Sequence, residues 1–169
     1  MVIDSSALIG ILRNEPEAQE FERAIQRDAV RLVSAVTRLE SGMVAAGRRG
    51  AAGAVDLGRL LTFIGATIVP FDERQADIAR DAFLRYGKGR HKAGLNFGDC
   101  AAYALAIAEA EPLLFMAWYR ELAAAIYADE LGPLFEEFRG LRPDFLRAAL
   151  DGAGGWCDDA TTPGRESCA

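Results

Sequence analysis

The sequence predicts an α/β protein with a central parallel sheet of about four strands and helices on both faces. Short apolar runs that end in capping or turn residues alternate with longer segments of helical periodicity, which is typical of parallel strands joined by crossover helices. The chain has 169 residues, of which 51% are hydrophobic and 26% charged. These values suit one globular domain that is long enough to bury most of its apolar surface.

The first element is a very short buried strand, Met1 to Ile3. The segment Asp4-Ser5-Ser6 then supplies helix-capping oxygens for an apolar helix over residues 7–12. Pro16 suits the first turn of a second helix that runs to about Asp28. Val30 to Val33 is expected to form the second strand.

A long helical region follows the second strand. Ser34 caps a helix that carries Glu40. Apolar residues of this helix recur at helical spacing, at Val36, Leu39, Met43 and Val44. The glycines from Gly47 to Gly50 break the pattern, and residues 51–65 form another helix.

The rest of the predicted sheet has two strands with helices between them. These elements are a strand over residues 66–69, a helix from Asp72 to about Tyr86, a helix over 98–110 and a strand over 112–115. Asp72 with Gln75 three residues later resembles a capping box. A polar loop over residues 87–96 separates the two helices.

The character of the chain changes after Phe115. Residues 116–150 are amphipathic and helical in pattern, interrupted by Pro133 and Pro143, and are expected to pack on or beside the sheet domain. Residues 151–169 carry almost no apolar side chains and predict a disordered tail. The expected organisation is therefore a domain over residues 1–115, a helical extension over 116–150 and a tail.

Composition excludes several classes of protein. The formal charge of −6 excludes a strongly basic nucleic-acid binder, so any RNA contact must come from a local patch. The three cysteines give neither a disulfide framework nor a zinc spacing. The N-terminus lacks a basic region followed by an apolar run, so no signal peptide is expected, and no apolar run reaches the roughly 20 residues of a membrane helix. A reducing cytoplasm fits best.

Three acids lie beside predicted strand-to-helix transitions. Asp4 follows the first predicted strand, and Glu40 lies one to two turns into the helix that follows the second strand. Asp99 lies at the start of the helix that precedes the last strand. If the strands share one parallel sheet, these carboxylates gather at one edge, where like charges raise each other's pKa unless a cation binds. A hard divalent cation with oxygen ligands answers that chemistry. The alternatives are helix capping by Asp4 and Asp99 and an exposed Glu40 paired with a neighbour such as Arg38.

The motifs around these acids resemble those of PIN-domain endoribonucleases that act as VapC toxins of bacterial toxin–antitoxin pairs. The resemblance covers about residues 1–115, and it is carried by the following segments: Val2-Ile-Asp4-Ser-Ser-Ala-Leu8, Ser34-Ala-Val-Thr-Arg-Leu-Glu40, Arg90-His-Lys-Ala-Gly-Leu-Asn96-Phe-Gly-Asp99-Cys100-Ala-Ala-Tyr103, and Glu111-Pro-Leu-Leu-Phe115. It implies a PIN-like three-layer α/β/α fold. It also implies Mg²⁺ or Mn²⁺ held by Asp4, Glu40 and Asp99.

The sequence departs from this family directly after Phe115. The family continues with a Lys-Gly-x-Asp-Phe-like segment that contributes a fourth acid, whereas here Met116-Ala-Trp-Tyr119 follows. A frameshifted or fused end and a diverged protein both explain the difference. Asp129 is a late substitute for the missing acid only if the chain turns back toward the site.

Further residues are assigned to the site and its partners. Ser6 is a second-shell residue or a plain helix-start hydrogen-bonding group, and Asn96 either orients a carboxylate or fixes the loop. A stretch without acids is expected either to contact RNA phosphates or to form a solvated loop, and consists of Arg85, Lys88, Arg90, His91 and Lys92. The resemblance further implies an RNA substrate, a cognate antitoxin and a homodimer.

Three functions compete on the sequence alone. The first is an endoribonuclease toxin that hydrolyses RNA phosphodiesters through a metal-activated water. The second is a catalytically weakened PIN-like protein that lacks the fourth acid and binds RNA or antitoxin without efficient cleavage. The third is a doubly wound domain for phosphoryl transfer or small-molecule binding, although no Gly-rich phosphate loop follows the first strand. We rank them in this order.

Overall fold

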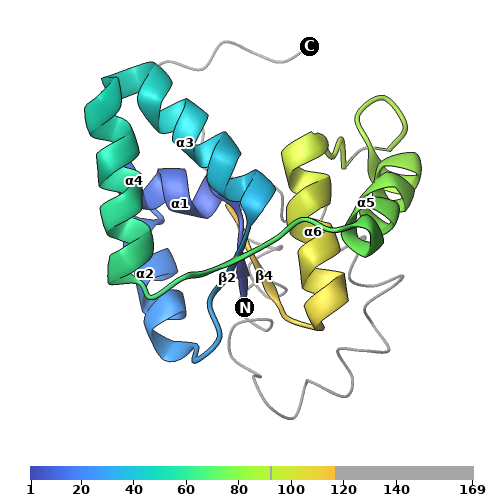
Figure 1. Ribbon diagram of the computed structural model, residues 1–169, viewed down its shortest axis with the longest axis horizontal. Helices are drawn as coiled ribbons and strands as arrows, with labels where there is room; N and C mark the ends of the chain where they lie inside the picture. The colour runs from blue at the N-terminus through green and yellow to red at the C-terminus, as the bar shows by residue number, and fades with distance from the viewer. Residues whose placement is uncertain (92, 117–169) are drawn as a thin grey trace, which may run out of the picture. The chain divides into compact units, whose positions relative to one another are not determined.

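Four parallel strands form one sheet in the computed structural model, which describes residues 1–91 and 93–116 (Figure 1). The strands are β1 (Val2–Ile3), β2 (Leu32–Ser34), β3 (Thr67–Val69) and β4 (Leu113–Leu114). Their order across the sheet is β3-β2-β1-β4, so β1 is paired on both sides, with Val2 opposite Leu32 and Leu113. The predictions for Lys92, Asp129, the helical extension and the tail lie outside the described residues.

Six helices connect and cover these strands in the described part of the chain. They are α1 (Ser5–Leu12), α2 (Ala18–Arg27), α3 (Ala35–Arg49), α4 (Ala51–Phe63), α5 (Glu73–Tyr86) and α6 (Phe97–Glu109). Among the described residues, no helix is long and apolar enough to cross a membrane.

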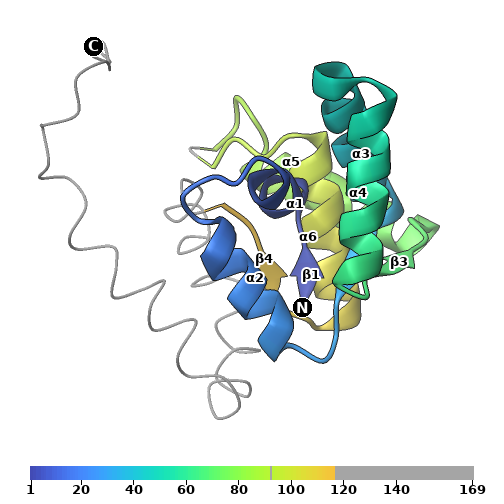
Figure 2. The same ribbon diagram turned by 90° about the vertical axis from the view of Figure 1, so that its left-hand side faces the viewer.

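Successive side chains of the short strands point to opposite faces of the sheet, and they contribute to two separate layers of the core. Ile3, Val33 and Leu114 point to the face that α1, α2 and α4 cover, where they pack in one buried cluster with residues such as Leu8, Ile25 and Leu61. Val2 points to the opposite face and packs with Leu105 of α6, together with Leu32 and Leu113. Because successive strand residues face opposite sides, this division confirms the predicted α/β/α layers (Figure 2).

Most element boundaries agree with the sequence, and the differences have local causes. Pro16 does not open the second helix, because α2 begins two residues later and Glu17 is its N-cap. Val30 is exposed and lies before β2. Helix α3 runs through Gly47 and ends at Gly50, whose φ of 60° is a left-handed value that interrupts a helix.

Helix α3 buries a different face from the one its apolar residues mark. The buried residues are Thr37, Ser41 and Ala45, whereas Leu39 and Met43 are 65% and 68% exposed. The helical periodicity predicted the helix correctly, but small and hydroxyl side chains allow its close approach to the rest of the domain. The face that includes Glu40 therefore turns inward.

The order in which the chain adds strands to the sheet reverses between β1 and β4. From β1 the chain adds β2 and then β3 on one side, and it returns to the other side of β1 for β4. In open α/β sheets, ligands bind outside the carboxyl ends of the strands at such a switch point. Asp4 directly follows β1 at this position.

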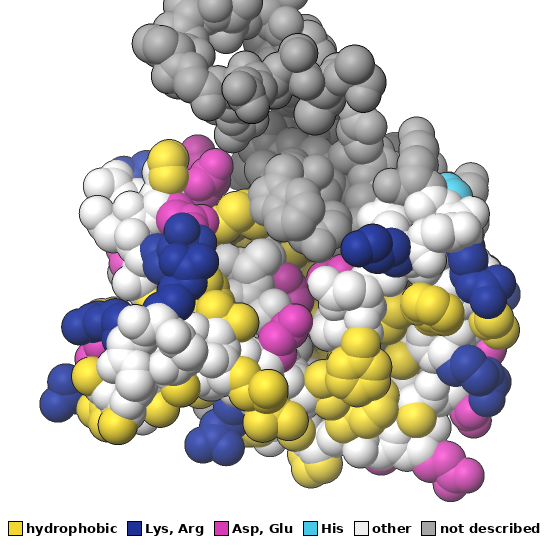
Figure 3. Space-filling view, turned by 90° about the horizontal axis from the view of Figure 1, so that it is seen from above, with side chains coloured by type: hydrophobic (Ala, Val, Ile, Leu, Met, Phe, Trp, Pro, Cys, Tyr) yellow, Lys and Arg dark blue, Asp and Glu magenta, His cyan; other side chains and the backbone are white. Residues whose placement is uncertain are grey.

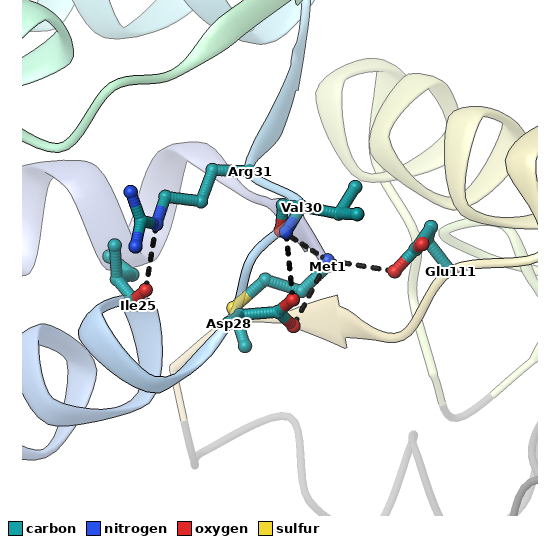
Figure 4. Close-up of polar contacts among 6 residues, drawn as sticks. All are labelled: Met1, Ile25, Asp28, Val30, Arg31 and Glu111. Carbon is teal, nitrogen blue, oxygen red and sulfur yellow. Dashed lines mark hydrogen bonds and ion pairs between the residues drawn. The ribbon is translucent and has the colours of Figure 1, made fainter. Parts of the chain in front are cut away.

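Polar contacts join the start of β1 and the residue before β2 to nearby helix ends and loops (Figure 4). The ammonium group of Met1 donates to Oδ2 of buried Asp28 at 3.1 Å, to the Val30 carbonyl at 2.6 Å and to Oε2 of Glu111 at 2.8 Å. Arg31 donates through Nε to the Ile25 carbonyl at 2.8 Å and through Nη1 to the Ile64 carbonyl at 3.1 Å. Arg31 thereby ties the C-terminal ends of α2 and α4 to β2.

Replacement of Arg31 tests this connection. We expect Arg31→Met to lower the free energy of unfolding by about 1–3 kcal/mol, because two carbonyl groups lose a charged donor. Arg31→Lys should lose nearly as much, since one ammonium group does not reproduce the wide fork of a guanidinium. Denaturant titration gives both values. Arg23→Met, a change at an exposed position of α2, is the control, and equal losses at positions 23 and 31 would contradict the assignment.

Candidate active site

Asp4 occupies the switch point and also caps α1. Its Oδ2 accepts hydrogen bonds from the backbone N–H of Ser6 at 3.0 Å and from the Ser6 hydroxyl at 2.6 Å. Its Oδ1 is buried and has no hydrogen-bond partner in the structure. One carboxylate oxygen thus caps the helix start, as the capping alternative predicts, and the other has no partner among the described residues.

Ser6 connects the ends of β1 and β4. Its hydroxyl donates to Asp4 and accepts a hydrogen bond from the backbone N–H of Met116 at 3.0 Å. Met116 stands where the chain leaves β4. Ser6 is therefore more than a helix-start residue, because it fixes the orientation of Asp4 relative to the neighbouring strand.

Glu40 extends from α3 toward Asp4. The side chain is partly buried, and this desolvation raises the pKa of its carboxyl group above the usual value of 4.5. A hydrogen bond from the Ser5 side chain works against that rise, and the negative charge of Asp4 adds to it. Oε2 of Glu40 is buried without a hydrogen-bond partner. Glu40 is thus not the exposed, paired glutamate of the alternative prediction.

Asp99 lies in the first turn of α6, in a reciprocal capping box with Asn96. Oδ2 of Asp99 accepts from the Asn96 backbone N–H at 2.7 Å, and Oδ1 of Asn96 accepts from the Asp99 backbone N–H at 3.0 Å. The Asn96 side chain thus caps α6, and the bond to the Asp99 carboxylate comes from the Asn96 backbone. Asp99 follows Gly98, against which the Glu40 carboxylate packs.

The structure brings Asp4 and Glu40 together, and the start of α6 adjoins Glu40. Within the described ranges, no group of three His, Cys, Asp or Glu side chains has the spacing of a bound metal. The Asp99 carboxylate is instead engaged with the backbone of its own helix start. The two unpartnered buried oxygens, on Asp4 and Glu40, nevertheless suit a hard cation, because burial of an unpaired carboxylate oxygen is costly.

The predicted basic stretch follows α5 and is partly organised by its own contacts. Nδ1 of His91 accepts a hydrogen bond from the Ala93 backbone N–H at 3.1 Å. The His91 and Tyr86 rings pack edge to face, with 5.5 Å between their centres. The Arg90 guanidinium lies 5.5 Å from the centre of the Phe83 ring. Figure 3 shows acidic side chains at the centre of one face, with Lys and Arg side chains on both sides.

Cys100 and Tyr103, two side chains of α6 that could act as nucleophiles, are poorly suited to covalent catalysis. Cys100 follows Asp99 but is buried, and burial raises the pKa of its thiol to about 11, with the Asp99 charge adding to the rise. Burial also raises the pKa of Tyr103 to about 12. Neither side chain is an ionised nucleophile at neutral pH.

Two residues of the site were not identified from the sequence. Ser5 was assigned only to helix capping, yet its side chain reaches Glu40. Gly98 was not assigned a role, yet it provides the surface on which Glu40 lies. The available signal was their direct adjacency to Asp4 and Asp99.

Comparison with known proteins connects this geometry with a family. Residues 1–116 match the PIN domain. A ribonuclease VapC of Mycolicibacterium smegmatis is 49% identical over 115 residues, which cover 68% of this chain and 89% of that protein. Ribonuclease VapC30 of Mycobacterium tuberculosis is 46% identical over 115 residues, with 68% and 88% covered. Ribonuclease VapC28 of the same species is 43% identical over 116 residues, with 68% and 87% covered.

Replacement of Glu40 tests the electrostatics of the metal-free site. The folded protein binds the Glu40 proton more tightly than the unfolded chain, because the folded-state pKa is raised. Ionised Glu40 therefore opposes folding at neutral pH, and this cost disappears as the pH falls through its folded pKa. In chelator, Glu40→Gln should raise the free energy of unfolding at pH 7, with a gain that shrinks toward pH 4.5.

Denaturant titration at several pH values measures this gain. Glu22→Gln, an equivalent change at an exposed position of α2, should leave stability unchanged at every pH. A pH-independent gain for Glu40→Gln, or a loss at pH 7, would contradict the burial argument.

Proposed function

The chain belongs to the PIN-domain family and is a homologue of VapC ribonucleases, and from this membership we propose that it is a metal-dependent endoribonuclease, the toxin of a toxin–antitoxin pair. The observation that carries the proposal is the Asp4–Glu40 pair, in which each carboxylate keeps one buried, unpartnered oxygen at the sheet's switch point. A bound cation would lower the cost of ionising both carboxylates.

In the proposed mechanism, Asp4, Glu40 and Asp99 hold Mg²⁺ or Mn²⁺. When bound, such an ion activates water for attack on a phosphodiester and offsets the charge that develops on the phosphate. Ser6 orients Asp4 through its 2.6 Å hydrogen bond, and Ser5 orients Glu40. Asn96 holds Asp99 at the start of α6, where the positive end of the helix dipole favours a carboxylate.

The alternative is a weakened enzyme that binds RNA or an antitoxin without efficient cleavage. The family match ends at residue 116, next to the point where the expected fourth acid is absent from the sequence. The Met116 backbone N–H is bonded to Ser6 there. A site with three acids holds a second cation less well, which would slow cleavage.

Substrate binding is proposed for Arg85, Lys88, Arg90 and His91, with Lys92 in the same stretch. This stretch is locally basic on a protein of formal charge −6. Its residues precede Asp99 by fewer than 15 positions. Phosphate contacts of this kind position RNA without reading its sequence. The structural contact of His91 with Ala93 favours a loop-organising role for this residue over general-base catalysis.

The antitoxin, the homodimer and a cytoplasmic location remain proposals from the family resemblance. Exposed apolar side chains on α3 and at the start of α6, Leu39, Met43 and Phe97, suit contact with another chain. Molar mass from light scattering distinguishes a dimer from a monomer, and a monomer at high concentration would contradict the dimer.

Isosteric substitution of the acids tests the proposed function. Asp4→Asn, Glu40→Gln and Asp99→Asn should each reduce cleavage of RNA by at least about 100-fold, because charge stabilisation worth several kcal/mol is lost. Asparagine caps helices as well as aspartate, so the Asp4 variant should remain folded. Gel assay of RNA with Mn²⁺ and with chelator measures the effect.

Asp77→Asn, which changes an exposed acid of α5, is the matched control and should keep full activity. Cleavage by the wild type that persists in chelator or in the Asp99 variant would contradict a carboxylate-held metal. Folded wild-type protein that binds RNA but does not cleave it would favour the weakened alternative.

The basic stretch makes a separate prediction about salt dependence. The triple variant Arg85→Gln/Lys88→Gln/Arg90→Gln should weaken binding of single-stranded RNA and reduce the slope of log K against log salt by up to about 2, since each lost phosphate contact accounts for about 0.7. Fluorescence anisotropy at several salt concentrations gives the slope. Arg23→Gln on α2 is the control, and an unchanged slope in the triple variant would contradict the assignment.

A further inference from the structure

Gly98 makes the closest approach between α6 and the candidate site. A β-carbon placed on this residue would overlap Oε2 of Glu40 and lie 2.7 Å from both its Oε1 and its carboxyl carbon. Real β-carbons do not make contacts of that length. The carboxylate of Glu40 therefore occupies the space that a side chain at position 98 would need.

The Glu40 carboxylate already has neighbours whose interactions a side chain at position 98 would disturb. Its carboxylate is partly buried, bonded by Ser5 on one side and exposed to the charge of Asp4 on another. Displacement of the carboxylate by a side chain at position 98 would alter its interactions with Ser5 and Asp4. A shift of Gly98 is restricted, because this residue is buried in the first turn of α6, between the two capping-box residues Asn96 and Asp99.

Other helical glycines in the described residues meet different surroundings. A β-carbon at Gly47 or Gly58 would meet no atom within 4 Å. One at Gly53 would overlap the Ala45 backbone, which makes Gly53 a helix-packing residue between α3 and α4. Among Gly47, Gly53, Gly58 and Gly98, only a β-carbon at Gly98 would meet a carboxylate of the candidate site.

We propose that Gly98 is a positioning residue for Glu40. By lacking a side chain, it lets the carboxylate lie against the N-terminal turn of α6, where the helix dipole favours negative charge. It also sets the distance between Glu40 and Asp99, its neighbour in sequence. The part of this inference that concerns metal binding depends on the proposed function, whereas the Gly98–Glu40 contact does not.

Gly98→Ala is the first variant that tests the proposal. A displaced Glu40 should lower the affinity for Mn²⁺ in calorimetry by about 10–100-fold, the range for loss of a group that orients a metal ligand. Cleavage should show a lower kcat with little change in KM for RNA, because the altered contact does not touch the substrate. Gly47→Ala, in the helix that carries Glu40, is the matched control and should leave both quantities unchanged.

Shortening the acid should relieve the overlap. In the Glu40→Asp/Gly98→Ala double variant, the carboxylate lies one methylene further from α6, so Mn²⁺ should bind more tightly than to Gly98→Ala alone. Wild-type affinity and kcat in Gly98→Ala, or a double variant that binds more weakly than both single variants, would overturn the proposal.

A stability cycle tests the contact without metal or RNA. In chelator, Gly98→Ala should lower the unfolding midpoint in the Glu40 protein and lower it much less in a Glu40→Ala background, where the carboxylate is absent. If Gly98→Ala does not fold, the double variant Glu40→Ala/Gly98→Ala should. Equal effects in both backgrounds, or a double variant that remains unfolded, would overturn the proposal.

This cycle also separates the two possible failures. Wild-type protein that neither binds Mn²⁺ nor cleaves RNA defeats the proposed function, while non-additive stability of the two substitutions still supports the contact.

Discussion

The proximity of two carboxylates, Asp4 and Glu40, in a partly buried volume is the constraint on which the candidate site depends. Each carboxylate has one buried oxygen without a partner, and burial together with the charge of Asp4 makes ionisation of Glu40 less favourable. The hydroxyl groups of Ser5 and Ser6 offset part of this cost by donating hydrogen bonds. A divalent cation would offset the remainder, and in that role it would stabilise the fold as well as supply chemistry.

The fold produces this proximity through very short strands. The strands β1 and β4 contain two residues each, so the acid that follows β1 and the backbone that leaves β4 lie close to the centre of the sheet. Ser6 links both strand ends with a single hydroxyl group. Helix α3 approaches this point because its inward face carries Thr37 and Ser41 where a core helix usually carries large apolar residues. The same choice of residues leaves Leu39 and Met43 on the surface.

Local sequence signals predicted the elements well, because they describe interactions between near neighbours. The N-caps Asp4, Ser34 and Asp72 accept the expected backbone hydrogen bonds, and the helical layers on both faces of the sheet follow the βα alternation and the family resemblance. Sequence periodicity could not give the inward face of α3, because that depends on which helix surface fits its neighbours. Ser5 and Gly98 were missed for a related reason. Their roles arise from Glu40, which lies more than 30 residues from Ser5 and more than 50 from Gly98.

Anomalous diffraction from crystals soaked in Mn²⁺ tests the central claim most directly, since it locates the ion without reference to activity. The account predicts a peak at the carboxyl end of β1, with oxygens of Asp4 and Glu40 at coordination distance and the Asp99 carboxylate turned toward the ion. Crystals of folded protein with no peak there, or with the ion bound only elsewhere, would contradict a metal centre built on these carboxylates.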